Sequence, residues 1–81
     1  MDRYSIESAY AFFHQKLRVY EHSTSEREMD HIEEVIASYT NTMSPDLYKE
    51  LSGGNQAYLR EHPSFKSDLR DAVAKLEAML T

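Results

Sequence analysis

The fold is decided by the stretch from Tyr4 to His22, which reads YSIESAYAFFHQKLRVYEH. Its apolar residues recur at alternating steps of four and three, the spacing that aligns side chains along one side of an α-helix. They are Ile6, Tyr10, Phe13, Leu17 and Tyr20. At about 100° per residue, Ala9, Phe12 and Val19 widen this stripe to roughly half of the helix circumference. A stripe this wide and aromatic predicts the central helix of a small bundle.

Two later segments carry the same spacing and predict two further long helices. The first follows the sequence Ser-x-x-Glu at residues 25–28, a capping box, and runs to about Thr40. The second begins at His62 or Ser64 and runs toward the C-terminus. The apolar residues of the two segments are Met29, Ile32, Ile36, Tyr39 and Met43, then Phe65, Leu69, Ala72, Leu76 and Met79.

The region between these segments predicts one or two short helices. Ser44 followed by Pro45 is a strong start signal, because proline at the first helical position loses no hydrogen bond. Gly53 ends this helix as a residue suited to the left-handed conformation. Asn55 or Gln56 opens a further short helix that reaches Glu61.

No segment alternates apolar and polar residues over the length of a β-strand. The sequence therefore predicts one all-α domain spanning residues 1–81. We expect a small helical bundle with three long amphipathic helices and one or two short helices between the second and the last. Ser5 is the predicted N-cap of the first helix, and the short connection predicts that the first two helices are antiparallel.

The net charge of −5 is concentrated in one segment of the chain. Residues 26–34 hold five carboxylates against Arg27 alone, a local balance of −4. Clustered lysine and arginine supply most of the affinity for nucleic acid and anionic membranes, so both are disfavoured as partners. The acidic run is compatible with a basic partner or with a solvated helix face.

The chain contains no cysteine, which excludes disulfides, thiolate chemistry and cysteine-based zinc sites. Its beginning, MDRYSIESAY, lacks the profile of a signal peptide. The longest apolar run, residues 9–13, falls far short of the roughly 20 residues that a membrane span needs. These features predict a cytoplasmic protein without a membrane partner.

Candidate metal and catalytic residues are sparse. Glu28 and His31 have the Glu-x-x-His spacing of di-iron bundles, but those sites need a second such motif and two more inward-facing glutamates. No second motif exists, so the sequence predicts neither a metal nor a cofactor. Capping roles account for Ser5, Ser25 and Ser44, among others, and we expect no enzyme.

The leading hypothesis is a non-catalytic protein–protein interaction module, acting as an adaptor, an inhibitor or immunity-type binder, or an accessory subunit. Its partner would be another protein or a second copy of the chain. The predicted binding residues lie on the edge of the first helix and on the acidic segment: Phe12, Lys16, Val19, Asp30, Glu33 and Glu34. The sequence slightly favours cover of Phe12 and Val19 by the short middle helices, and exposure would make them a docking strip.

The alternative hypothesis is a nucleic-acid-binding regulator. Residues 45–61 loosely resemble a helix-turn-helix, with two short helices around a glycine turn. The second of these helices offers few groove-reading side chains, chiefly Gln56 and Arg60, and Glu61 opposes them. DNA binding is therefore the less favoured reading.

Overall fold

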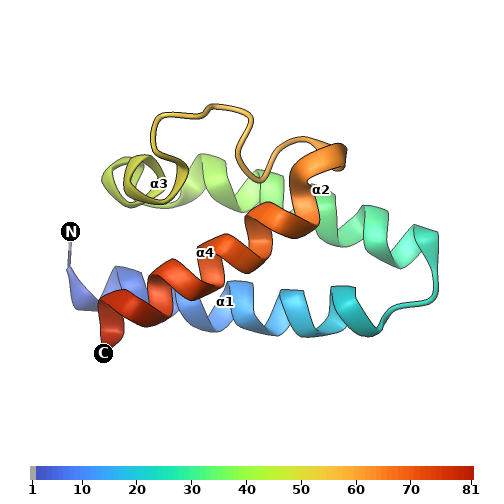
Figure 1. Ribbon diagram of the computed structural model, residues 1–81, viewed down its shortest axis with the longest axis horizontal. Helices are drawn as coiled ribbons and strands as arrows, with labels where there is room; N and C mark the ends of the chain where they lie inside the picture. Colours follow the sequence, from blue (N-terminus) through green and yellow to red (C-terminus); the bar gives the residue numbers. More distant parts are fainter. Residues whose placement is uncertain (1) are drawn as a thin grey trace.

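The computed structural model describes residues 2–81, which form four α-helices, one short 3₁₀-helix and no strand (Figure 1). The elements in chain order are α1 (Arg3–His22), α2 (Glu26–Thr42), α3 (Pro45–Ser52), the 3₁₀-helix η1 (His62–Ser64) and α4 (Phe65–Leu80). The prediction of an all-α bundle with three long helices, and short ones between the second and the last, is confirmed. No helix in the described range is long and apolar enough to cross a membrane.

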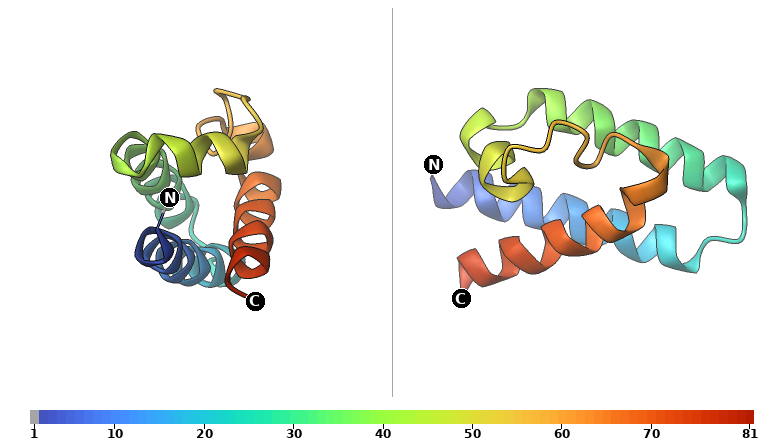
Figure 2. Two further views of the ribbon diagram at one scale, coloured as in Figure 1. Left: turned by 90° about the vertical axis from the view of Figure 1, so that its left-hand side faces the viewer. Right: turned by 45° about the horizontal axis from the view of Figure 1, so that its top comes forward.

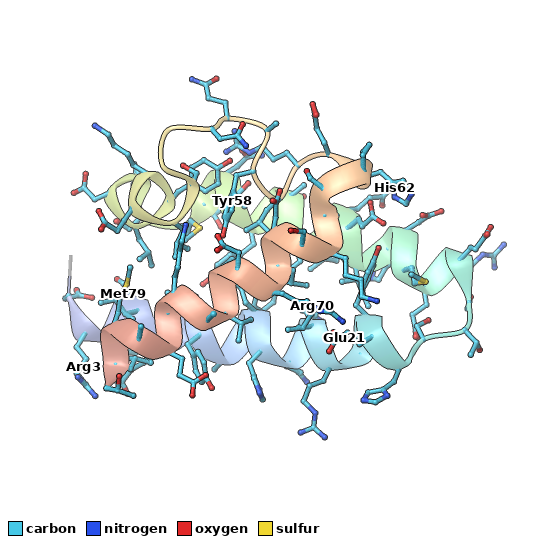
Figure 3. All side chains as sticks on the ribbon, in the orientation of Figure 1. Arg3, Glu21, Tyr58, His62, Arg70 and Met79 are labelled. Atoms are coloured by element: carbon cyan, nitrogen blue, oxygen red, sulfur yellow. The ribbon has the colours of Figure 1, made fainter. Side chains whose placement is uncertain are left out.

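α1 and α2 are antiparallel, and α4 returns along α1 in the opposite direction to it (Figures 1 and 2). Polar contacts join α1 and α4 at both ends. The Arg3 guanidinium donates to the carbonyl of Leu80 over 3.3 Å, and Arg70 pairs with Glu21 (Figure 3). α3 runs from α2 across toward α4 and covers the side of the bundle between these two helices (Figure 2). The side on which α1 and α2 lie next to each other is a different one.

Three of the predicted helix ends are present. Ser25 accepts a hydrogen bond from the Glu28 N–H over 3.3 Å, and Ser44 caps α3 in the same way over 3.4 Å. Gly53 ends α3 with a φ of 63°, the left-handed conformation that glycine adopts without steric cost. These ends depend on residues within one helical turn, which is why local sequence signals predict them.

The predicted N-cap of α1 is wrong. α1 begins at Arg3, because the Asp2 carboxylate accepts a hydrogen bond of 2.7 Å from the backbone N–H of Ser5. A carboxylate is also favoured at a helix N-terminus by the helix dipole, which a serine hydroxyl does not match. α2 likewise extends two residues beyond the predicted end, to Thr42.

Residues 53–61 contain no helix, so the predicted helix from residue 55 to 61 is wrong. They form successive turns, and Leu59 adopts a left-handed φ of 63°. Tertiary contacts replace the missing helical bonds: the Leu59 N–H donates to Asp68 over 2.9 Å, and the Tyr48 hydroxyl donates to the Tyr58 carbonyl over 2.7 Å. Tyr58 in turn donates its own hydroxyl to Asp71 over 2.8 Å. The segment is thereby attached to both α3 and α4.

The buried apolar residues form one cluster at the centre of the bundle. Leu59 belongs to it and is fully buried, which explains why the turns fold inward at that point. Every long helix and α3 contribute to the cluster, whose members are Ala9, Phe13, Tyr20, Ile32, Ile36, Leu47, Leu51, Tyr58, Leu59, Phe65, Leu69, Ala72, Val73 and Leu76.

Candidate functional site

α2 has two flanks of different chemistry, and together with neighbouring residues of α1 they hold all six predicted binding residues. On one flank α2 faces α1; we call this surface the α1–α2 seam. It is defined by Phe12, Lys16 and Tyr39, which lie against one another, and by Val19, seven residues beyond Phe12 on α1. On the other flank α2 faces η1; we call this surface the acidic hollow. It is lined by Asp30, Glu33, Glu34, Ala37, Arg60 and His62.

At the α1–α2 seam an aromatic pair joins the two helices. The rings of Phe12 and Tyr39 stack with centroids 4.4 Å apart and an interplanar angle of 18°. Tyr39 also meets the buried Phe13 edge-on at 5.3 Å, and Lys16 Nζ lies 5.5 Å from the centre of the Phe12 ring. Both stacked rings are half-buried, and burial raises the pKa of the Tyr39 hydroxyl.

Val19 lies at the outer edge of this seam and is 41% exposed. It also borders a shallow depression of about 440 Å³ on α1, together with His14, Arg18 and others. The predicted cover by the short middle helices is therefore wrong for Val19. Phe12 is partly covered, but the ring that stacks on it is Tyr39 of α2. The short helix α3 spans a different side of the bundle (Figure 2).

The acidic hollow is a shallow depression of about 500 Å³ beside α2. It brings together the three predicted acidic residues, since Asp30, Glu33 and Glu34 follow one another at steps of three and one along the helix. Asp30 and Glu34 are exposed. Glu33 differs, because its side chain is only 15% exposed and contacts two other side chains, Tyr20 and His62.

Glu33 connects three elements of the fold. Its Oε2 accepts a hydrogen bond of 2.9 Å from the hydroxyl of Tyr20 on α1 and lies 2.9 Å from Nδ1 of His62 on η1. Burial of the Tyr20 ring, together with this hydrogen bond, raises the pKa of its hydroxyl to about 12. The hydrogen bond to Glu33 and the charge of that carboxylate raise the pKa of His62.

Asp30, Glu33 and His62 each offer one possible ligand atom, and these atoms lie within 4.8 Å of one another. Figure 3 shows His62 at the junction of η1 and α2. The spacing motif singled out in the sequence, Glu28 and His31, is exposed at both positions, and His31 has no place in this cluster. Sequence reasoning missed His62, because nothing local to it indicates a partner 29 residues away.

Arg60 borders the hollow but is engaged elsewhere. Its Nε donates to Thr40 over 3.0 Å, its Nη2 donates to Asn41 over 3.2 Å, and its guanidinium lies 4.5 Å from the centre of the Tyr48 ring. These contacts fix the turn segment against α2 and α3. The helix-turn-helix hypothesis thereby loses both its second helix and the availability of its main cationic side chain.

Comparison of the chain with protein-family models, with curated proteins and with solved structures finds no match.

Proposed function

We propose that this chain is a non-catalytic protein–protein interaction module that binds an amphipathic helix of another protein along the α1–α2 seam. One observation carries the proposal. An aromatic pair, Phe12 and Tyr39, joins α1 to α2 and is half-buried, and Val19, seven residues from Phe12 on α1, is exposed. Aromatic side chains are enriched at protein interfaces and among the residues that contribute most to binding.

The spacing along α1 suits a helical partner. Phe12 and Val19 are seven residues apart, which corresponds to about 10.5 Å along the helix at 1.5 Å per residue. An amphipathic helix presents apolar side chains at the same interval, and helix-in-groove binding uses such anchors. A partner helix lying along the seam would cover both side chains at once.

The position of Lys16 favours a different protein over a second copy. Lys16 lies between Phe12 and Val19 in the sequence, so a two-fold contact that pairs these two residues would bring two Lys16 side chains close together. Like charges in a contact that excludes water are unfavourable. The partner helix should instead carry a carboxylate between two apolar residues, and the free chain should be monomeric by light scattering.

The predicted acidic residues Asp30, Glu33 and Glu34 lie on the opposite flank of α2, so they do not belong to this contact. The non-catalytic character of the proposed module is a prediction from the sequence, like its partner class. A cytoplasmic location remains a prediction of the sequence.

The proposal can be tested by selecting helical peptides from a display library on the purified protein. We expect the enriched peptides to carry apolar residues seven apart with an aspartate or glutamate between them. Their binding should shift the NMR signals of Phe12, Val19 and Tyr39. Enriched peptides that perturb other surfaces, or no enrichment at all, would argue against the seam.

Two variants sharpen this test. Val19→Asp adds a charge within the seam, and we expect it to abolish peptide binding and the capture of native partners. Ala11→Asp adds the same charge at an exposed position of α1 away from the seam and serves as the matched control. Equal binding by the two variants would rule out the seam as the docking surface.

A further inference from the structure

The cluster in the acidic hollow differs from an exposed acidic patch in one respect: it includes an imidazole. His62 Nδ1 lies 2.9 Å and 3.0 Å from the two carboxylate oxygens of Glu33, and the Asp30 carboxylate completes the group. The three side chains come from two elements, since Asp30 and Glu33 lie one turn apart on α2 and His62 belongs to η1.

We propose that Asp30, Glu33 and His62 bind a divalent transition-metal ion of the zinc type. The donor set is one nitrogen and two carboxylate oxygens, a combination used by zinc, which accepts histidine, aspartate and glutamate ligands. Calcium and magnesium prefer sites made of oxygen atoms alone, so the imidazole selects against them. Water would complete a tetrahedral arrangement at the exposed side of the hollow.

The geometry needs only a small adjustment. Zinc ligands at about 2.0–2.1 Å from the metal lie roughly 3.3 Å from one another in a tetrahedral arrangement. The three ligand atoms now lie within 4.8 Å of one another, so the farthest of them must move inward. The His62 side chain is 76% exposed, and Asp30 is exposed as well, so both can reorient without disturbing the core.

Tyr20 gives the site a fixed point. Its hydroxyl donates to Glu33 Oε2 over 2.9 Å from a ring that is 5% exposed, so this carboxylate is oriented from inside the bundle. Hydrogen bonds of this kind to a ligating carboxylate orient the ligand and commonly support metal affinity. A bound metal would replace the direct contact between His62 Nδ1 and Glu33 as the link between these two side chains.

The inference is independent of the proposed function, because the site lies on the other flank of α2 from the α1–α2 seam. A bound ion would join η1 directly to α2. It would thereby hold the turn segment, residues 53–61, at the end where it enters η1.

The test is a calorimetric titration of the purified, metal-free protein with zinc sulfate. We expect one zinc ion per chain for the native sequence. His62→Ala and Asp30→Asn should each weaken zinc binding by about tenfold or more, since a second ligand cannot take over. NMR signals of the His62 ring nitrogens should shift on zinc addition. An excess of calcium or magnesium should not displace the zinc.

The matched control is His31→Ala, which removes an exposed histidine of α2 that is adjacent to Asp30 in the sequence but lies outside the cluster. We expect it to bind zinc as the native protein does. Circular dichroism of His62→Ala should show an unchanged fold, because the side chain is exposed. Zinc binding that survives in His62→Ala, or that is lost equally in His31→Ala, would show adventitious binding and overturn the proposal. No binding to the native protein would overturn it as well.

Discussion

The two flanks of α2 are stabilised by different physical means. At the α1–α2 seam, Phe12 and Tyr39 pack ring against ring, and the contact needs only apolar surfaces at helical spacing. At the acidic hollow, Glu33 has to meet a hydroxyl from α1 and an imidazole from η1 within hydrogen-bond distance. Packing tolerates small displacements, whereas a buried polar group requires a correctly placed partner. α2 thus presents one flank that depends on apolar packing and another that depends on exact hydrogen-bond geometry.

The largest expected change in stability comes from removing an aromatic ring of the α1–α2 seam. Tyr39→Ala removes the ring that stacks on Phe12 and meets Phe13. It should lower the free energy of unfolding by about 2–3 kcal/mol, less than the loss of a fully buried aromatic ring. Urea denaturation followed by circular dichroism measures this change. Tyr4→Ala is the control, because Tyr4 is 78% exposed and should cost little.

The second-largest expected change in stability concerns Glu33 in the acidic hollow. Glu33→Ala leaves the Tyr20 hydroxyl without its acceptor and should cost about 1–2 kcal/mol of unfolding free energy. Adding Tyr20→Phe to this variant should recover part of the loss, because the unsatisfied donor is then removed. Glu34→Ala, at the exposed neighbouring position, is the control. Additive losses in the double variant would mean that the two side chains are not coupled.

Lowering the pH should weaken the contacts of the Asp71 carboxylate and leave the apolar packing at the α1–α2 seam unchanged. Burial acts to raise the pKa of Asp71, but hydrogen bonds from Tyr58 and Lys75 outweigh it, so the pKa lies below the ordinary value of an aspartate in the unfolded chain. A lowered pKa in the folded state means that Asp71 stabilises the fold above that value and loses its contribution as the pH falls through the folded pKa.

Unfolding free energies measured at successive pH values between neutrality and the acid range check this expectation. Asp71→Asn should reduce the loss of stability in acid, whereas Tyr39→Ala should lower stability by a similar amount at each pH. An identical acid dependence in Asp71→Asn and the native protein would contradict the role of the Tyr58–Asp71 contact.

The smallest expected effect concerns the outer edge of the seam. Val19→Ser should change the free energy of unfolding by less than about 0.5 kcal/mol, because most surface substitutions away from special features fall in that range. Phe12→Ser should cost more, since Phe12 stacks on Tyr39. Marked unfolding of Val19→Ser in circular dichroism would show that Val19 is part of the core.

The parts of the fold that the sequence predicts are those that depend on neighbours along the chain. The periodic stripes placed the three long helices, and Ser25, Ser44 and Gly53 marked ends that the structure confirms. Each of these signals concerns a helix face or a single turn. Such contacts form wherever the backbone is helical, so tertiary structure does not need to be known in advance.

The remaining features depend on contacts between distant segments. The turn segment keeps local backbone hydrogen bonds, such as that from Tyr58 to Asn55, but its Leu59 N–H bonds to Asp68 on α4 and its Arg60 side chain bonds to Thr40 on α2. Of the acidic hollow, the helical spacing of Asp30 and Glu33 was visible in the sequence. His62 and Tyr20 were not, because they reach Glu33 only through the packing of α1 and η1 against α2.

The backbone conformation and burial of Leu59 together limit which residues can replace it. Its left-handed backbone suits glycine or asparagine, whereas its fully buried side chain requires a large apolar residue. Glycine would relieve the backbone but leave a cavity, and isoleucine or valine would fill the core with a β-branched residue that tolerates a positive φ least. Exposed neighbours such as Gln56 carry neither restriction. The stretch with the least regular structure thus contains a position with very few acceptable replacements.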